Sequence, residues 1–235
     1  MAKTLENWLA TEVAELQKLP LGDLSNIHFF RDPLRPNFID HEYFFSPADG
    51  TILYQKVVEP NDAVVEVKGI NYTIKDIMGD KHFDQPVLVI GIFMSLYDVH
   101  INRVPYGGLL SYKKLDSIAS TNKPMLAVEK DILNQAINPN NMDYIKNNER
   151  MLNTFYVPSL NYKYYVVQIA DEDVDVITPF KDQKEFVGQN ERFSAIRWGS
   201  QTDLILPLSK DFDFELCQKD HMHIEAGLDA LVKIL

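Results

Sequence analysis

The sequence predicts a single α+β domain over residues 1–235, built mostly of antiparallel β-sheets with a helix at the N-terminus. From about Phe44 onward, at least six short runs of β-branched and aromatic residues are separated by Gly, Pro, Asn and Asp, a pattern typical of strands joined by turns. These runs are not spaced by the regular helical segments that parallel βαβ units need, so antiparallel pairing is favoured. No internal repeat, low-complexity tract or Pro/Ser-rich linker divides the chain.

The composition is that of a folded soluble protein, with 46% hydrophobic and 24% charged residues. A chain of this length buries roughly 70–75% of its unfolded surface, so it needs no disulfide or metal to hold a core. The single cysteine, Cys217, excludes an internal disulfide. The 23 Lys and Arg residues against 34 Asp and Glu give a net charge of −11, which repels phosphate backbones, and we expect no nucleic-acid partner.

The first element expected along the chain is a helix over residues 4–19, which ends at Pro20. Its apolar residues recur at helical spacing: Leu5, Trp8, Leu9, Val13 and Leu16. Such a stripe usually packs on the core, and this is the favoured interpretation. The alternative is a helix that lies in a bilayer interface with Trp8 at headgroup depth, although glutamates outnumber lysines on its polar side.

The strands are expected in the segments TILYQKVVE, AVVEVKGINYTI, PVLVIGIFMSL, GGLLSYKKL, KYYVVQIA and TDLILPL. A helical stretch at roughly 128–150, broken near 138–141, interrupts them. The most apolar run, residues 87–94, is far shorter than the ~18–20 residues that a membrane-spanning helix needs. The N-terminus lacks the cationic and apolar regions of a signal peptide. We therefore expect no transmembrane segment.

Three places combine residues that could carry chemistry. Asp49 lies in the turn SPADG, His100 lies in the string DVHINR after an apolar strand, and Ser200 follows Gly199 at the start of a strand. A serine, a histidine and an aspartate on separate loops of a β scaffold can form an activated nucleophile. The alternative is a turn aspartate and a hydrogen-bonded core histidine without a chemical role.

Several segments match a known family in their order and local sequence: FFRDP at 29–33 with Arg35, SPADG at 46–50, IFMSLYDVHINRVPYGG at 92–108, NNER at 147–150, QIA at 168–170 and ERFSAIRWGSQTDLILP at 191–207. Through them the chain resembles the phosphatidylserine decarboxylase family, specifically its short bacterial branch. The matching segments punctuate nearly the whole chain.

The resemblance implies that the chain makes its own cofactor. In this family a serine hydroxyl attacks the preceding carbonyl, here that of Gly199, and β-elimination of the resulting ester cuts the chain. The serine becomes a dehydroalanine, which hydrolyses to ammonia and a pyruvoyl group. Cleavage between Gly199 and Ser200 would give a β chain of residues 1–199 and an α chain of residues 200–235, with the pyruvoyl group formed from Ser200. Glycine places no side chain beside the attacked carbon.

By the same resemblance, Ser200 is the nucleophile, His100 is the base and Asp49 is the partner of His100. Long-form members carry a second histidine three residues beyond the first, where this chain has Arg103. We therefore expect His100 to serve both self-cleavage and turnover. In turnover the pyruvoyl ketone forms a Schiff base with the substrate amine and accepts the electrons released as CO2 leaves.

Arg103 and Asn102 are the candidates for binding the carboxylate or phosphate of the substrate, because a guanidinium fork matches either oxyanion. The alternative for Arg103 is a salt bridge to Asp98 or elsewhere. Arg31 and Arg35 are further candidates for phosphate contact, with a solvated or packing role as the alternative.

The string C-x3-H-x-H, formed by Cys217, His221 and His223, contains residue types that bind zinc. It has no fourth ligand nearby and reads as a strand, a turn and a second strand, so we expect no metal.

The resemblance implies decarboxylation of phosphatidylserine to phosphatidylethanolamine by a cytoplasmic protein held peripherally at the inner face of the cell membrane, with homodimerisation left open. One alternative is decarboxylation of a free aromatic amino acid. The acidic run at 171–175, where short-form relatives usually have glycine and basic residues, leaves room for it because these carboxylates oppose an anionic bilayer.

Two other classes are disfavoured. A non-catalytic β module would not need to keep Gly199, Ser200, His100 and Asp49. A hydrolase would place its serine in a G-x-S-x-G turn, whereas Ser200 follows glycine at the start of a strand.

Overall fold

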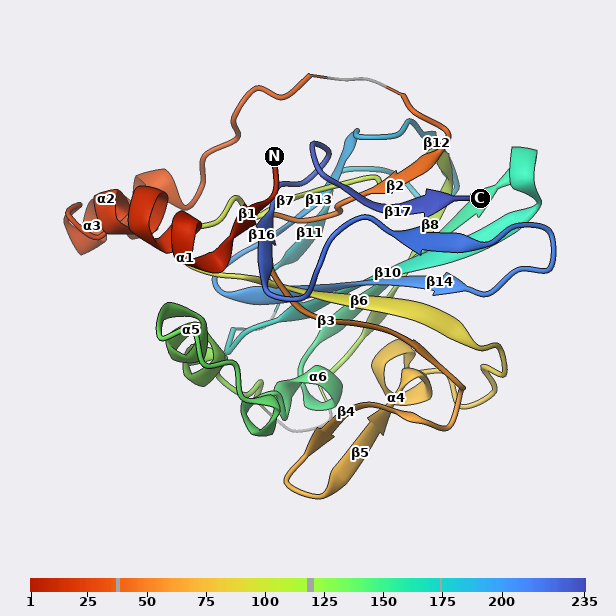
Figure 1. Ribbon diagram of the computed structural model, residues 1–235, viewed down its shortest axis with the longest axis horizontal. Helices are drawn as coiled ribbons and strands as arrows, with labels where there is room; N and C mark the ends of the chain where they lie inside the picture. The colour runs from red at the N-terminus through yellow and green to blue at the C-terminus, as the bar shows by residue number, and fades with distance from the viewer. Residues whose placement is uncertain (37–38, 118–120, 174) are drawn as a thin grey trace.

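The structure is a computed structural model that describes residues 1–36, 39–117, 121–173 and 175–235 (Figure 1). Within these ranges the central feature is a nine-stranded sheet whose neighbouring strands are all antiparallel. In spatial order its strands are β1 (Lys3–Thr4), β16 (Met222–Ile224), β3 (Gly50–Val58), β6 (Val87–Met94), β14 (Ser200–Pro207), β10 (Tyr162–Ala170), β9 (Arg150–Val157), β8 (Gly108–Leu115) and β12 (Glu185–Val187). The predicted mostly antiparallel fold is confirmed.

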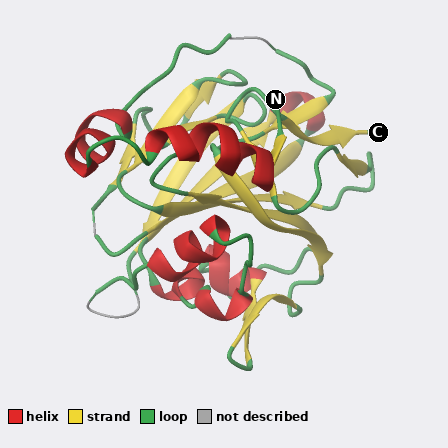
Figure 2. Cartoon of the chain, turned by 60° about the vertical axis from the view of Figure 1, so that its left-hand side comes forward, coloured by secondary structure: helices red, strands yellow, loops and turns green. Residues whose placement is uncertain are grey.

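Smaller sheets and short helices flank the central sheet on its two faces (Figures 1 and 2). The smaller sheets are β11 (Ile177–Pro179), β13 (Arg192–Ile196) and β7 (Ile101–Arg103); β15 (Phe214–Leu216), β17 (Ala230–Ile234) and β2 (Tyr43–Phe45); and the hairpin β4 (Ala63–Val67) and β5 (Ile70–Thr73). The α-helices are α1 (Leu5–Trp8), α2 (Ala14–Leu16), α3 (Leu21–Asp23), α4 (Ile74–Met78), α5 (Leu126–Leu133) and α6 (Tyr144–Asn147).

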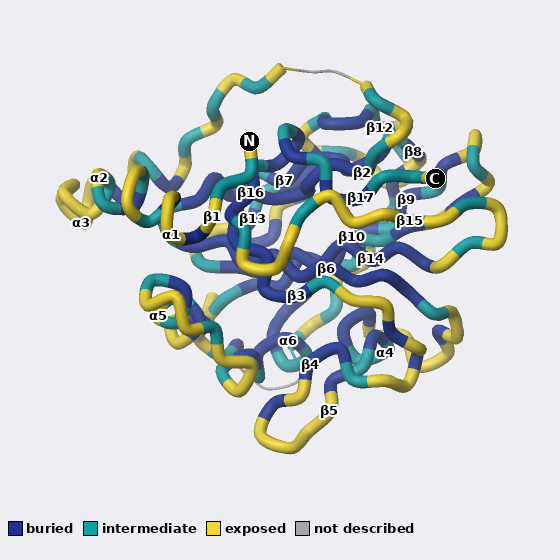
Figure 3. Tube along the Cα trace, viewed as in Figure 1, coloured by how far each residue is buried: buried dark blue, intermediate teal, exposed yellow. Residues whose placement is uncertain are grey.

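Two apolar cores lie on opposite faces of the central sheet. One joins the sheet to β2, β13 and β17 through residues such as Phe44, Phe193 and Val232. The other joins it to α4, α5 and α6 through residues such as Ile77 and Val128. Because both faces are covered, every residue of β6 and β14 is buried (Figure 3). Burial on both faces explains why β6 has an unbroken apolar sequence rather than an alternating one.

The N-terminal helix packs on the domain, as its apolar stripe predicts. The segment runs as one continuous helical rod through α1, a π-helical stretch at Leu9–Val13, and α2. Trp8 is only 1% exposed and its ring stacks on His223, with ring centroids 4.2 Å apart. Trp8 is therefore a core residue and does not reach headgroup depth in a bilayer.

A second helical segment follows the first where the sequence predicted only a stop. Pro20 precedes α3, which continues as a π-helical stretch over Leu24–His28. Proline is compatible with the start of a helix because the first amide groups have no intrahelical partner. The predicted stretch at 128–150 is also divided, since α5 and α6 are separated by a 3₁₀ turn at Pro139–Asn141 and residue 150 already begins β9.

The C-terminal segment 200–235 contributes strands to the central sheet and to one of the flanking sheets. It supplies the central strand β14, the strand β16 between β1 and β3, and β15 and β17 of a flanking sheet. No helix in the described part of the chain is both long and apolar enough to cross a membrane.

Gly91 in β6 provides a test of this packing, because the ring of Tyr54 crosses the strand at that point. A Cβ on Gly91 would lie 2.4 Å from a carbon of that ring. We expect Gly91→Ala to lower the free energy of unfolding by about 1–3 kcal/mol through overpacking. Urea titration of the uncut Ser200→Ala chain would measure it. Gly22→Ala, where a Cβ meets nothing within 4 Å, is the control. Equal stability of the two variants would contradict the packing.

Candidate active site

Ser200 lies where the central strand begins. Its backbone pairs with Met94 of β6 on one side and with Ala170 of β10 on the other. The side chain is fully buried, and its hydroxyl lies 3.4 Å from the sulfur of Met94 without an oxygen or nitrogen partner among the described residues. Two residues earlier, Trp198 adopts a left-handed conformation with φ of 63°, which turns the chain into β14. A buried hydroxyl without a strong hydrogen bond is free to act as a nucleophile.

Gly199 is held against a carboxylate that the sequence did not associate with it. A Cβ on Gly199 would lie 2.7 Å from Oδ2 of Asp171, closer than real Cβ contacts allow. Asp171 occupies this place because it follows Ala170, the partner of Ser200 in the neighbouring strand. Its other oxygen, Oδ1, accepts hydrogen bonds from the backbone amides of Met125 and Glu172, both at 2.7 Å. Glycine is thus the residue that fits at position 199.

His100 is buried beside this turn. Its ring packs on Phe29 with centroids 4.2 Å apart, and Phe29 in turn lies 5.5 Å from the ring of Trp198. Nδ1 lies 3.2 Å from the backbone carbonyl of Asp98, which can only accept, so Nδ1 carries the proton. Nε2 is buried and has no hydrogen-bond partner within the described ranges.

Burial lowers the pKa of His100 to about 4, although Asp98 and the carbonyl of Met94 oppose the shift. The ring is therefore neutral at pH 7. A neutral imidazole with an unengaged Nε2 has the protonation state that a general base requires.

Asp49 does not orient His100, and this part of the predicted triad is not found in the structure. Both carboxylate oxygens of Asp49 accept from the guanidinium of Arg35 at 2.6 Å, and Oδ1 also accepts from the amide of Ala226 at 2.7 Å. A guanidinium fork matches a carboxylate in two places at once, which a single imidazole nitrogen cannot. Neither His100 nitrogen is bonded to Asp49 in the part of the chain that is described.

Asp98 has a histidine partner that the sequence did not reveal. Its Oδ1 lies 2.7 Å from Nε2 of His223, and Oδ2 accepts from the amide and hydroxyl of Ser95. Burial alone would raise the pKa of Asp98, but His223 and Ser95 hold it below its ordinary value. Arg103 makes no salt bridge with Asp98 in the described ranges, but the alternative of a salt bridge elsewhere is confirmed, because its guanidinium lies 3.9 Å from Asp32.

The residues of the C-x3-H-x-H string do not gather into one site. Cys217 and His221 are exposed, whereas His223 is buried between Asp98 and Trp8. In the described ranges no group of three or more His, Cys, Asp or Glu side chains is arranged to hold a metal ion.

Asn102 lies near Ser200, but its polar atoms are already used. The side-chain amide donates to the carbonyl of Pro47 at 3.1 Å and lies 3.4 Å from the hydroxyl of Thr202, while its oxygen accepts from Gln168 at 2.7 Å. The residue is fully buried. These bonds tie the SPADG turn to β10 and β14, which is a positioning role.

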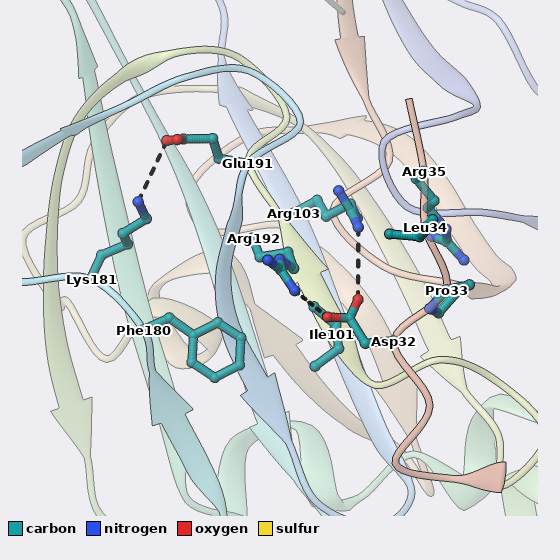
Figure 4. A pocket seen from close by; sticks show the side chains of 10 residues that line it. All are labelled: Asp32, Pro33, Leu34, Arg35, Ile101, Arg103, Phe180, Lys181, Glu191 and Arg192. Atoms are coloured by element: carbon teal, nitrogen blue, oxygen red, sulfur yellow. Dashed lines mark hydrogen bonds and ion pairs between the residues drawn. The ribbon is translucent and has the colours of Figure 1, made fainter. Parts of the chain in front are cut away.

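Arg103 borders a charged pocket of about 640 Å³ (Figure 4). Its guanidinium donates to the carbonyl of Asn190 at 3.0 Å and lies 3.9 Å from Asp32. Arg35 in the lining is neutralised by Asp49, and the remaining charged side chains are Arg103, Lys181 and Arg192 against Asp32 and Glu191. In a chain with a net charge of −11, this local excess of positive charge favours an anion.

Arg31 and Arg35 hold backbone and carboxylate groups of the protein itself. Arg31 donates to the carbonyl of Tyr97 at 2.7 Å and lies 3.3 Å from that of Asp98, so it supports the loop before His100. Arg35 is bound to Asp49 and to the carbonyl of Ala226.

A buried polar network on the opposite face of β14 also escaped sequence reasoning. Asp203 accepts from the hydroxyl of Tyr54 at 2.9 Å and from the amide of Gln201 at 2.6 Å, and Gln201 also accepts from Tyr144. Burial raises the pKa of Asp203 to about 7. Because side chains alternate along a strand, Gln201 and Asp203 point away from the face that carries Ser200.

The low pKa of His100 predicts an acid-dependent loss of stability. The unfolded residue takes up a proton below about pH 6.5, whereas the folded residue does so only near pH 4. The contribution of His100 to stability should therefore fall as the pH drops through this window, by about 2 kcal/mol between pH 7 and pH 5. The raised pKa of Asp203 acts in the opposite direction, so the contribution of His100 is read as the difference between the parent and His100→Asn. Urea titrations of the uncut Ser200→Ala chain at both pH values, with and without His100→Asn, would measure it.

The exposed His82 provides the matched control. His82→Asn should leave the pH dependence of stability as it is, whereas His100→Asn should gain about 2 kcal/mol on the parent between pH 7 and pH 5. The same pH dependence in the parent and in His100→Asn would contradict a neutral buried ring.

Comparison with known proteins agrees with the resemblance noted in the sequence. Residues 25–230 match the phosphatidylserine decarboxylase family. A protein of Methanocaldococcus jannaschii, named as an archaetidylserine decarboxylase proenzyme, is 31% identical over 78% of this chain and 79% of its own length. A phosphatidylserine decarboxylase proenzyme of Novosphingobium aromaticivorans is 33% identical over 92% of this chain and 73% of its own length. The chain thus belongs to the phosphatidylserine decarboxylase family of carboxy-lyases.

Proposed function

We propose that this protein cuts itself between Gly199 and Ser200 and, as the mature pyruvoyl enzyme, converts phosphatidylserine to phosphatidylethanolamine. The observation that carries the proposal is the Gly199–Ser200 bond itself, at the entry of a fully buried central strand, with a serine hydroxyl whose only hydrogen-bond partner among the described residues is the sulfur of Met94. The names of the two relatives both describe proenzymes that act on a serine-bearing lipid.

His100 is the proposed base for the Ser200 hydroxyl. The hydroxyl of Ser200 lies beside the sulfur of Met94, and the backbone carbonyl of His100 accepts from the amide of Ile196, in the segment that leads to Ser200. The proton passes from the hydroxyl to Nε2 while Nδ1–H stays on the carbonyl of Asp98. The oxygen then attacks the carbonyl carbon of Gly199, and the C–N bond between residues 199 and 200 breaks. This leaves an ester between the two residues, and the released amine takes the proton from Nε2.

The residues around position 200 suit a pyruvoyl group. The group would replace the side chain of Ser200 in a buried site beside Met94, Thr202 and Asn102. It would supply an electron sink for the carbanion formed as CO2 departs. The buried Nε2 of His100 has no partner in the described ranges and can hold the proton that the product carbon needs.

The substrate phosphate is proposed to bind in the pocket of Figure 4. Arg103 and Arg192 both approach Asp32 there, so an incoming phosphate would replace one acidic neighbour of these two guanidinium groups. Phosphate accepts two parallel hydrogen bonds from a guanidinium, which favours arginine over lysine for this role.

Contact with a bilayer is proposed for residues 20–30, called the arm, which contain α3 and the π-helical stretch after it. Leu21, Ile27 and Phe30 are 72%, 68% and 50% exposed, and the arm projects from one side of the body (Figures 1 and 3). The arm leads directly to Phe29, which touches both His100 and Trp198. A bilayer at this surface would therefore deliver lipid headgroups near the cleavage turn.

A free amino acid is the second candidate substrate, and the exposed side chains of Glu172, Asp173 and Asp175 favour it. Exposed acidic groups disfavour binding to an anionic bilayer but do not disfavour binding of a small zwitterion. Assaying CO2 release from phosphatidylserine vesicles and from free aromatic amino acids in parallel separates the two.

Self-cleavage gives the direct test of the proposed function. The purified chain should yield two components of residues 1–199 and 200–235, and the smaller should resist Edman sequencing because a pyruvoyl group blocks its N-terminus. Ser200→Ala should stay whole and release no CO2. Intact mass measurement separates these outcomes, and a single unmodified chain after prolonged incubation at neutral pH would overturn the proposal.

The arm predicts a specific loss of membrane binding. Ile27→Glu should weaken sedimentation with phosphatidylserine vesicles by at least about tenfold, because it removes an apolar contact worth roughly 1.5–3 kcal/mol. Ile70→Glu, at a similarly exposed site in the β4–β5 hairpin, is the control. Activity on a short-chain soluble substrate should survive in both variants. Equal binding by both would move the contact elsewhere.

A further inference from the structure

Asp171 has one carboxylate oxygen fixed and the other unused. Oδ1 is held by the amides of Met125 and Glu172, whereas Oδ2 accepts no hydrogen bond and has no cationic partner in the described ranges. Oδ2 instead rests against Gly199, the residue that self-cleavage would detach from position 200. The carboxylate is therefore oriented toward the place where the reacting group of the mature enzyme would stand.

Cleavage would change the neighbour of this carboxylate. In the uncut chain Oδ2 meets an uncharged glycyl peptide, but after the cut residue 199 ends in a second carboxylate. Two like charges at this distance, in a partly buried place, repel each other. Arg197 and Trp198 are exposed and Gly199 is only partly buried, whereas Ile196 before them is buried, so a cut end of three residues lies outside the core. Departure of residue 199 would uncover Oδ2 beside position 200.

We propose that Asp171 binds the ammonium group of the substrate in the mature enzyme and holds it beside residue 200. This rests on the proposed function, since it requires a cut chain. A carboxylate with one oxygen anchored by two amides and the other free is suited to pair with a cation. The lipid headgroup and a free amino acid both present an ammonium group, so Asp171 recognises the chemistry that the two candidate substrates share.

The ionisation of Asp171 is consistent with this role. Burial, together with Glu172 and Asp173, raises its pKa to about 6, and the amides of Met125 and Glu172 oppose the rise. The group is still charged at pH 7. A bound ammonium would relieve the same repulsion that raises the pKa.

The test compares Asp171→Asn with Glu172→Gln, a neighbour that loses the same charge from an exposed side chain. Each protein is first shown by mass to be cut. Two nucleophiles then react with residue 200: a substrate amine, charged at pH 7 and trapped by cyanoborohydride, and hydroxylamine, which is neutral at that pH. The mass of the smaller chain reports both adducts without relying on turnover.

For Asp171→Asn, we expect trapping of the amine and kcat/KM to fall by about 10- to 100-fold, the range for loss of one charge-assisted bond. Its hydroxylamine adduct should form as in the parent, and Glu172→Gln should match the parent in both. Asp171→Glu should recover much of the amine reaction. Phosphatidylserine vesicles and free aromatic amino acids are run side by side, and the one whose reaction depends on Asp171 is the source of the ammonium.

Other outcomes overturn the proposal in distinct ways. An equal loss with hydroxylamine would show general distortion, and an equal loss in Glu172→Gln would show an effect of bulk charge. Failure of Asp171→Asn to be cut, while the parent is cut, would assign the residue to self-cleavage instead. A parent chain that stays whole would reject the proposed function itself, whereas a cut parent with unchanged Asp171→Asn rejects only the role of Asp171.

Discussion

The pairing of β14 with β6 and β10 is the constraint on which the site depends. It places Ser200 between Met94 and Ala170, and therefore places Asp171 against Gly199 and the end of β6 beside the nucleophile. Because side chains alternate along a strand, a slip of one residue would turn Ser200 to the opposite face. Coverage of both faces by apolar cores makes such a slip costly, so the sheet sets the geometry of the cleavage bond.

The first residues of β14 divide two polar environments between the faces of the sheet. Ser200 and Thr202 face Met94 and Asn102. Their hydroxyls make only long contacts there, at 3.4 and 3.5 Å to the sulfur of Met94 and at 3.4 Å to the amide of Asn102. Gln201 and Asp203 belong to a network of short hydrogen bonds on the other face. A satisfied buried network fixes one arrangement of a core. The face that carries Gln201 and Asp203 thus holds the strand in place. The face that carries Ser200 leaves its hydroxyl without a short hydrogen bond.

The elements that the sequence predicts correctly are those whose signal lies in neighbouring residues. The apolar run at 87–94 coincides with β6, and the N-terminal stripe is buried at Leu5, Trp8 and Val13. The DVHINR string and the Gly199–Ser200 pair can be recognised from the sequence because their order of residues is characteristic of the family. The second helical segment was missed because Pro20 is a stop in one helix and a start for the next.

The partners of the acidic residues could not be predicted in the same way. Asp98 meets His223 across 125 residues, and Asp171 meets Gly199 only because β10 and β14 are in register at Ala170 and Ser200. Such contacts depend on the order and register of strands, which no local pattern records. The expected pairing of Asp49 with His100 is wrong for the same reason, because the fold places Arg35 against both oxygens of the carboxylate.

Asp49, the expected partner of His100, and Asp98 both bind the segment that the proposed cleavage would separate. Asp49 bonds the amide of Ala226, its partner Arg35 bonds the carbonyl of the same residue, and Asp98 bonds His223. Removing one member of a buried charged pair typically costs about 3–5 kcal/mol. These bonds join residues before position 199 to residues after position 200 without using the chain itself. These contacts would hold the two chains together after the proposed cut between Gly199 and Ser200.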